Sequence, residues 1–351
     1  MVTVSERLAD YVLGFKYPDL TREAIAEAKR VILHEMGAGI VGSQSPLSKM
    51  VSEFAIDAGG PEEATVMGRG TKVWCANATL ANGMAFRHPE YCGSLSDHDI
   101  LTATHPGENI PAALAICEKL GLGGKDLITA TVLGAELYGR LAMVASIERM
   151  AGIRHTTLSI FVVPLMVGKL MGLSKEQLVN ALGISGSFGL TLNECHSGEH
   201  VYPARDLCYA WGAHRGISAV LLAQKGFTGP PTVFEGDWGF LRVLGDEGIR
   251  GRARLAKVFE KREGFLITGY RYKLKVGDMT VQSAGDAILD IRREHKIDPK
   301  DVKEIKVYKE GTTDDTAFEA RRRPVNKCDA DHSLWYTLAR ALIDGDLQYP
   351  E

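Results

Sequence analysis

Three polar segments of the sequence combine histidines with acidic or cationic residues, a combination suited to proton transfer beside carboxylates. The first, residues 88–111, contains Glu90 and His105 in a predicted loop that runs into a helix. Pro106 fixes the backbone beside His105 and Asn109 opens the helix. We therefore expect the imidazole at a helix N-terminus, where the dipole lowers its pKa. For most of the other charged residues in this segment, a solvated loop is the alternative interpretation.

The second and third segments each offer one candidate side chain. His155 follows Arg154 and precedes two threonines directly before an apolar helix, so it is either a catalytic base or a cap of that helix. Arg205 lies in the third segment, residues 193–206, between two predicted helices. Its planar guanidinium suits the recognition of a substrate carboxylate through two hydrogen bonds. An ordinary salt bridge at the helix start is the alternative interpretation for Arg205.

Other catalytic chemistries have weaker support in the sequence. Cys195 adjoins His196, but adjacent positions rarely align a thiolate nucleophile with its base. The serines and threonines near histidines lack a GxSxG elbow, and no HExxH or comparable ligand pair is present. The glycine-rich segments do not follow a predicted strand with GxGxxG spacing. The sequence therefore predicts a site without a metal or an organic cofactor.

Composition restricts the class of protein and its partners. The chain has 351 residues, of which 45% are hydrophobic and 24% charged, and this favours a soluble globular protein of two domains. A net charge of −3 gives no electrostatic reason to expect a nucleic acid or a membrane surface as partner. The six cysteines form no CxxC pair, and the N-terminus lacks a secretory signal, so we expect reduced thiols and a cytoplasmic location.

Residues 1–265 are predicted to form a large, all-helical domain. Thr21 is a plausible N-cap, residues 174–177 (SKEQ) have the form of a capping box, and a helix is expected over residues 111–120. Asp126 is expected to begin a long helix. Its apolar sequence contains Glu136 and Arg140, which would pair on one face and argue against a membrane span. Frequent Gly and Ala indicate closely packed helices.

Residues 266–351 are predicted to form a smaller α+β domain. A helix is expected from about residue 282 to residue 294, and residues 304–309 (EIKVYK) alternate like a half-buried strand. From Asp331 onward the pattern is helical again. The predicted fold is therefore mainly α, with a large helical domain and a smaller α+β domain.

Several segments, taken together and in order, resemble one known family. They are ANGMAFRH (81–88), THPGENIPAALAICEKLGLGGKDL (104–127), RHTT (154–157), GLSKEQLVNALGISGS (172–187), LLAQKGFTGPPTVFEGDWGF (221–240) and ADHSLWYTLARALIDGD (330–346). They are similar to the MmgE/PrpD family of 2-methylcitrate dehydratases, cis-aconitate decarboxylases and iminodisuccinate epimerases. The resemblance runs from about residue 5 to the end of the chain.

The resemblance implies a set of catalytic residues. It puts His105 and His155 in the active site, as a base and an acid whose order stays open. Lys273, in GYRYKLKVGD, matches a family lysine that faces the substrate from the smaller domain. Tyr336 matches a tyrosine near the pocket in the DHSL-x-Y motif.

The resemblance also implies substrate-binding residues, and here the sequence departs from the family pattern. Asn82 falls in the family's NG-x-x-x-R/H stretch, Glu90 at the first Asp of a D-[FY]-[ND]-D motif, and Arg205 where many members have lysine. Residues 92–94 (CGS) replace the later positions of the acidic motif, and Asp278 stands where relatives often have histidine or another polar group. An arginine cannot deliver a proton as a lysine can.

The family pattern implies a helical domain and a smaller α+β lid with the active site between them, usually in a homodimer. The expected activity is that of a cofactor-free lyase, similar to 2-methylcitrate dehydratase, which abstracts a proton next to a carboxylate of a small di- or tricarboxylate. A decarboxylase, an epimerase and a non-catalytic dimeric family member are the open alternatives. The chain ends well before family members usually do, so the lid is expected to be incomplete at its C-terminus.

Overall fold

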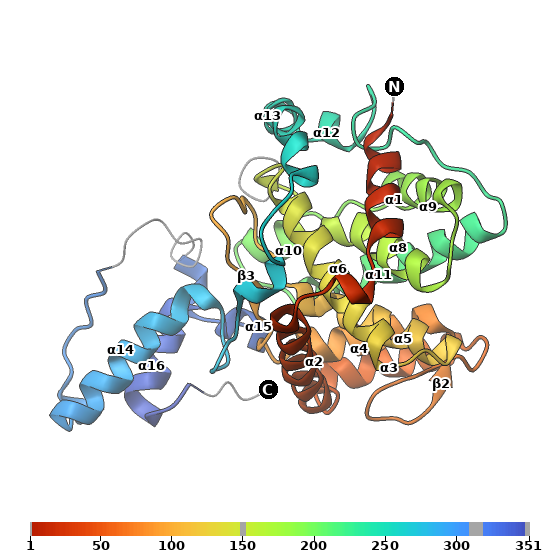
Figure 1. Ribbon diagram of the computed structural model, residues 1–351. Helices are drawn as coiled ribbons and strands as arrows, with labels where there is room; N and C mark the ends of the chain where they lie inside the picture. Colours follow the sequence, from red (N-terminus) through yellow and green to blue (C-terminus); the bar gives the residue numbers. More distant parts are fainter. Residues whose placement is uncertain (1, 148–151, 309–318, 348–351) are drawn as a thin grey trace.

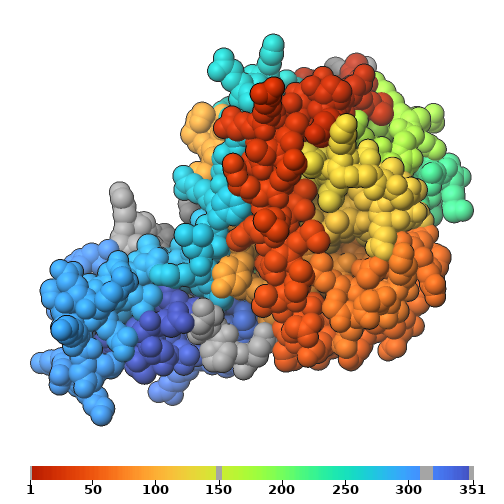
Figure 2. Space-filling model, turned by 60° about the horizontal axis from the view of Figure 1, so that its bottom comes forward, coloured from red at the N-terminus to blue at the C-terminus, as the bar shows by residue number. Residues whose placement is uncertain are grey.

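The computed structural model describes residues 2–147, 152–308 and 319–347. Within these residues the chain forms mainly α-helices, which confirms the predicted fold class at that level. Figure 1 shows the helices up to α13 gathered into one body, with α14 and α16 side by side at its edge. Figure 2 shows the same small unit, in blue, lying against one side of the body.

The helical body contains helices of very different lengths. In chain order they are α1 (Val4–Gly14), α2 (Arg22–Gly42), α3 (Pro46–Ala58), α4 (Cys75–Arg87), α5 (Ile110–Leu120), α6 (Gly124–Ala142), α8 (Ser159–Leu170), α9 (Lys175–Ser187), α10 (Glu194–Ser197), α11 (Ala204–Gln224), α12 (Phe240–Val243) and α13 (Asp246–Arg254).

Helix α4 lies at the centre of this body, and each of its residues is buried. It packs against α2, α3, α5 and α11. Gly83 allows the close approach of α11, since a Cβ atom at this position would lie 2.5 Å from the Cβ of Ala210. Small residues thus bring helix axes together, as their frequency in the sequence indicated.

The predicted helix ends agree closely with the structure. Thr21 caps α2 by accepting a hydrogen bond from the amide of Ala24 at 3.1 Å, and the capping box at Ser174 opens α9. Helix α6 begins at Gly124, two residues before the predicted start. The carboxylate of Asp126 accepts from the amide of Gly123 at 3.0 Å and so caps the helix from within its first turn.

The long apolar helix α6 carries the predicted ion pair on one of its faces, and the structure shows that this pair is buried. The Nε of Arg140 lies 2.9 Å from an oxygen of Glu136, and both side chains are buried. Arg140 also donates to the carbonyl of Val258, and Glu136 accepts from the amide of Leu266, so the pair joins α6 to the segment that follows α13. Among the described helices, none combines the length and the apolar character needed to cross a bilayer.

Two short antiparallel strand pairs complete the body. Strand β1 (Ala64–Thr65) pairs with β2 (Lys72–Val73), and β3 (Ser94–Leu95) pairs with β4 (Tyr270–Arg271). The second pair joins positions far apart in the sequence. It brings the loop after α4 against the segment that leads to the small unit.

The small unit consists of α14 (Met279–His295), α15 (Lys327–Ala330) and α16 (Leu334–Asp344). Helix α14 begins three residues earlier than predicted because the carboxylate of Asp278 accepts from the amide of Thr280 at 2.8 Å. Val281 packs with Leu334 and Leu338 in a cluster separate from the main core, whose last residue is Tyr270. The division at residue 265 stays a prediction.

The strand predicted at residues 304–309 is wrong where it can be compared. Residues 302–308 have no regular secondary structure, and Tyr308 is 92% exposed; residue 309 lies outside the described part. An alternating segment needs a neighbouring strand to complete its hydrogen bonds, and no described segment pairs with it. In its described residues the part predicted as an α+β domain, 266–351, is therefore helical apart from the short strand β4, which pairs with β3 of the body.

Candidate active site

A buried carboxylate, Glu90, is surrounded by three cationic side chains. One oxygen of Glu90 lies 2.5 Å from Nη1 of Arg205 and 3.1 Å from Nη1 of Arg87, and the other lies 2.5 Å from Nζ of Lys273. All four side chains are at most 3% exposed. Burial raises the pKa of the Glu90 carboxyl, but the three cations outweigh this effect and hold that pKa well below its usual range.

Three separate elements supply this cluster. Arg87 is the last residue of α4, Arg205 lies in the first turn of α11, and Lys273 follows β4. Glu90 itself has a φ of 60°, in the left-handed region that a residue with a Cβ rarely adopts. Its ion pairs hold the backbone in this conformation, which costs about 1–3 kcal/mol at such sites.

Gly93 is the point where the loop after α4 meets the segment of β4. Its carbonyl accepts a hydrogen bond from Nδ1 of His105 at 2.9 Å, and its amide donates to the hydroxyl of Tyr270 at 3.0 Å. A Cβ atom at this position would collide with the Tyr270 ring and with the carbonyl of Arg271. A glycine therefore stands in place of an acidic residue of the family motif because β4 approaches so closely.

The two predicted catalytic histidines lie together. The ring centroids of His105 and His155 are 5.2 Å apart, and both residues are buried. Because a carbonyl can only accept, Nδ1 of His105 must carry the proton and Nε2 the lone pair of the neutral ring. Burial lowers the pKa of His105 well below its ordinary value, with further lowering by Arg87, His155 and Lys273. The ring is therefore neutral near pH 7.

Two buried glutamates that we did not single out from the sequence adjoin this centre. Glu108 lies 3.1 Å from Nε of Arg87, and burial raises its pKa to about 7 despite that cation. Glu35 on α2 accepts from the amide of Gly93 at 3.2 Å, and burial raises its pKa as well. For Glu108, the usable signal in the sequence was its position between two prolines at a helix start.

Further polar residues extend the cluster behind Arg205. Its guanidinium lies 2.6 Å from Asp206, whose other oxygen accepts from Nδ1 of His88 at 2.9 Å and from the thiol of Cys328 at 3.1 Å. Burial raises the pKa of Asp206, but Arg205 and His88 outweigh it and lower that pKa. Arg205 thus forms the salt bridge with a neighbouring acidic residue that the alternative interpretation expected, here Asp206. It also pairs with Glu90.

A second histidine pair lies where the body meets the small unit. His196 of α10 and His332 pack edge to face with ring centroids 5.2 Å apart. Nδ1 of His332 lies 2.5 Å from Asp331, and its Nε2 lies 3.6 Å from Asp278. Burial lowers the pKa of His196 well below its ordinary value. His332 was part of the family motif in the sequence, but its position beside His196 could not be read there.

Two of the predicted site residues, Asn82 and Tyr336, make contacts of another kind. The side-chain amide of Asn82 accepts a hydrogen bond from the backbone amide of Met67 at 2.8 Å and donates one to the carbonyl of Thr65 at 2.9 Å. It thus links α4 to the segment of β1. We therefore leave Asn82 out of the site. Tyr336, in the first turn of α16, packs in an apolar cluster with Tyr91, the sequence neighbour of Glu90.

Three groups among the described residues place possible metal-ligand atoms within 4.8 Å of one another: His88, Asp206 and Cys328; His196, Asp278 and His332; and Asp97, His98 and Asp99. In the first group Asp206 already pairs with Arg205, and burial raises the pKa of Cys328, which disfavours the thiolate that a metal requires. The cofactor-free site stays a prediction.

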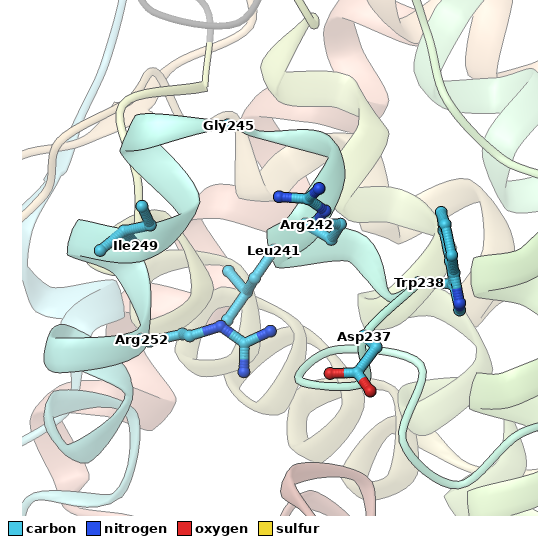
Figure 3. A pocket seen from close by; sticks show the side chains of 7 residues that line it. All are labelled: Asp237, Trp238, Leu241, Arg242, Gly245, Ile249 and Arg252. Carbon is cyan, nitrogen blue, oxygen red and sulfur yellow. The ribbon is translucent and has the colours of Figure 1, made fainter.

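A separate surface pocket of about 490 Å³ lies between α12 and α13 (Figure 3). Trp238, Arg242 and Arg252 line it, and Trp238 is 93% exposed. Arg252 uses its guanidinium to donate to the carbonyl of Glu235 at 2.7 Å. The pocket contains none of the predicted site residues, so its size alone does not make it the active site.

Comparison with known proteins gives a consistent family assignment. The family model for the MmgE/PrpD N-terminal domain matches residues 6–250, and that for the C-terminal domain matches residues 279–351. Cis-aconitate decarboxylase of Homo sapiens is 24% identical over an alignment of 375 residues, gaps included. The alignment covers 99% of this chain and 72% of the relative.

Two further relatives carry the name of a dehydratase. A probable 2-methylcitrate dehydratase of Saccharomyces cerevisiae is 24% identical over 266 residues, which cover 69% of this chain and 50% of the relative. The 2-methylcitrate dehydratase of Escherichia coli is 22% identical over 251 residues, which cover 67% of this chain and 50% of the relative. Enzymes of two reaction types therefore share this sequence pattern at similar, low identity.

Proposed function

The chain belongs to the MmgE/PrpD family, and we propose that it is a lyase similar to 2-methylcitrate dehydratase. Its substrate is a small di- or tricarboxylate, and the first step removes a proton from the carbon next to a carboxylate. Loss of hydroxide from the adjacent carbon then completes the reaction. The related enzymes with dehydratase and decarboxylase names support this class of substrate.

The observation that carries the proposal is the buried pair of His105 and His155, with ring centroids 5.2 Å apart. We assign His105 as the base, because burial lowers its pKa and Gly93 fixes its proton on Nδ1, so that Nε2 is free to accept. His155 is then the partner that donates a proton to the departing hydroxide. Two adjacent imidazoles supply one acceptor and one donor without a third reagent.

The cations around Glu90 account for carboxylate recognition. Arg205 and Lys273 are positioned to bind substrate carboxylates and to stabilise the negative charge that develops after proton loss. Glu90 binds both of them here, so a substrate carboxylate must exchange with Glu90 or share the cations with it. Since these charges are buried, each contact has a larger effect than it would have in water.

Substrate entry requires a movement of the small unit. His105, His155, Lys273, Arg205 and Glu90 are all at most 8% exposed, so the site is closed in this structure. Lys273 lies on the segment between β4 and α14, and its ion pair with Glu90 joins that segment to the body. We propose that opening withdraws Lys273 and that closure over substrate returns it.

A homodimer is part of the proposal. Helix α2 exposes Leu33, Ile40 and Val41, and the neighbouring α3 exposes Met50 and Phe54, all at more than half of their surface. Both helices pack on α4 and follow one another in the chain, and exposed apolar side chains of this kind are typical of a surface that binds another protein. Sedimentation velocity on the wild type and on a Leu33→Asp/Val41→Asp variant tests this part, and a wild-type monomer contradicts it.

The test of the activity is a proton NMR time course in D₂O. The purified chain is mixed in turn with 2-methylcitrate, citrate, cis-aconitate, tartrates and aspartate-derived diacids. We expect deuterium to enter the carbon next to a carboxylate, and the product to be an unsaturated acid. The His155→Ala variant should lose both signals. If a folded sample shows no exchange and no product across this panel, the proposal is wrong; carbon dioxide release would replace the dehydratase by a decarboxylase.

A further inference from the structure

We propose that Cys195 and Cys208 form a dithiol modification site, which a two-electron oxidant such as a peroxide converts into a disulfide. The two Sγ atoms lie 3.6 Å apart, although the residues belong to different helices, α10 and α11. A disulfide has an S–S bond of about 2.05 Å, so the sulfurs need to approach by roughly 1.5 Å. Rotation about the two side-chain bonds, together with a small shift of the four-residue helix α10, supplies this distance.

The surroundings of the two thiols differ from those of the other cysteines. Cys195 and Cys208 are partly exposed, whereas Cys75, Cys92, Cys117 and Cys328 are buried. A surface cavity of about 290 Å³ borders Cys208 and gives a small oxidant access to it. The pair is thus both close enough to cross-link and accessible to a reagent.

Cys195 is the thiol expected to react first. The S–H of Cys208 can donate to the sulfur of Cys195 and lowers its pKa to about 7, and the cations Arg154 and Arg205 act in the same direction against burial. The corresponding contact raises the pKa of Cys208. Near neutral pH a large fraction of Cys195 is therefore thiolate, the nucleophilic form, while Cys208 keeps its proton.

The chemistry balances with hydrogen peroxide as the oxidant. The Cys195 thiolate attacks one peroxide oxygen, the O–O bond breaks, and hydroxide leaves and takes up a proton to become water. Cys195 is then a sulfenic acid. The sulfur of Cys208 attacks the sulfur of Cys195, the S–O bond breaks, and a second water leaves with the proton of Cys208. Two thiols are oxidised by two electrons in total, and one peroxide is reduced to two waters.

This assignment replaces the nucleophile interpretation of the Cys195-His196 dipeptide. In the structure Nδ1 of His196 lies 3.2 Å from the hydroxyl of Ser197, while the sulfur of Cys195 lies near Cys208 and the carbonyl of Leu192. Cys195 therefore has a resolving thiol beside it. A sulfenic acid formed there is captured as a disulfide before it oxidises further.

The dithiol adjoins the proposed active site. His196, which packs against His332, directly follows Cys195, and Arg205 lies one helical turn before Cys208. A disulfide would tie α10 to α11 and shift both residues. If the proposed lyase activity holds, we expect oxidation to lower kcat/KM on the order of 10²-fold, a loss that a misplacement of about 1 Å in an active site can cause.

The test measures the thiols directly and so does not depend on the proposed activity. The full chain is treated with hydrogen peroxide at pH 7, its free thiols are counted after denaturation, and unreduced peptides are mapped by mass spectrometry. We expect the loss of two of the six thiols, their return with dithiothreitol, and a linked peptide pair containing Cys195 and Cys208. Survival of all six thiols, or a linkage to another cysteine, would overturn the proposal.

Two variants sharpen the result. In Cys208→Ser, Cys195 should stop at the sulfenic acid, which dimedone traps, and no linked pair should form. Cys117→Ser, at a buried position on α5, should still lose two thiols, as the wild type does. Loss of two thiols in Cys208→Ser would also contradict the proposal, because the pair would then not be the site of oxidation.

Discussion

Residues 88–105 contribute to two clusters of ion pairs. The clusters contain similar residue types but differ in their exposure to water. Around Glu90, three cations surround a carboxylate that is fully buried. A few residues later, Asp97 and Asp99 pair with Arg262 and Lys257 at distances of 2.5–3.2 Å, but the lysine is 41% and the aspartates 18–19% exposed. His98, between these aspartates, has 86% of its side chain exposed.

The difference lies in the surroundings and not in the residue types. Helices α4 and α11 cover the first cluster, so its charges cannot be screened by water, and the pKa values of Glu90 and His105 move far from their ordinary range. The second cluster lies at the surface, where water and salt screen each pair. Acid–base chemistry is expected only in the first, and the two can be compared by matched substitutions.

The largest contrast should come from the histidines. Once the lyase activity of the wild type has been measured, His105→Ala should lower its rate about 10²–10⁴-fold, which is the contribution of general acid–base catalysis. His98→Ala should leave the rate unchanged. Both are measured as kcat under saturating substrate, with circular dichroism as a check on folding. A rate loss of the same size in both variants would remove the distinction between the clusters.

The next contrast concerns the charge at Glu90. Glu90→Gln removes the negative charge and leaves Arg205 and Lys273 buried without it, which should lower the free energy of unfolding by about 3–5 kcal/mol. Glu90→Asp keeps the charge and should lose less. Urea denaturation of both variants measures the difference. Equal losses would show that shape, and not charge, sets the stability of the cluster.

A pH dependence follows from Glu108. Burial raises its pKa from 4.5 to about 7, so between these pH values the folded chain holds a proton that the unfolded chain has released. The free energy of unfolding therefore falls as pH rises through this window, by about 3 kcal/mol for a group so shifted. Glu108→Gln should remove that part of the decline between pH 5 and pH 8. The exposed Glu62→Gln is the control, and an unchanged decline in Glu108→Gln would contradict the assignment.

The smallest effect is expected in the exposed cluster. Asp97→Asn removes the 2.6 Å pair with Arg262, which also contacts Asp99 at 3.2 Å and so keeps one partner. The free energy of unfolding should fall by about 0–1 kcal/mol, and by less at high salt. Urea denaturation at two salt concentrations measures this. A loss that matches that of Glu90→Gln, or one that salt does not reduce, would make the two clusters equivalent.

Local features of the fold could be predicted because they depend on neighbouring residues. Helix caps at Thr21 and Ser174 and the pair of Glu136 and Arg140 follow from spacings of three or four residues. The strand predicted at residues 304–309 is wrong because strand formation depends on a distant segment. An alternating pattern indicates a strand only when another segment pairs with it. Asn82 was assigned by its motif alone, and its two backbone partners are Thr65 of β1 and Met67, two residues after it.

The sequence by itself determined the mainly helical fold, the family and the histidines and cations available for chemistry, because these depend on residue type and local order. The tertiary structure decided which of them meet. The pairing of β3 with β4 brings Lys273 against Glu90 across 183 positions of the chain, and the packing of α11 on α4 adds Arg205. Burial then separates Glu90 and Glu108 from the partly exposed Asp97, since charges removed from water acquire the large pKa shifts that suit proton transfer.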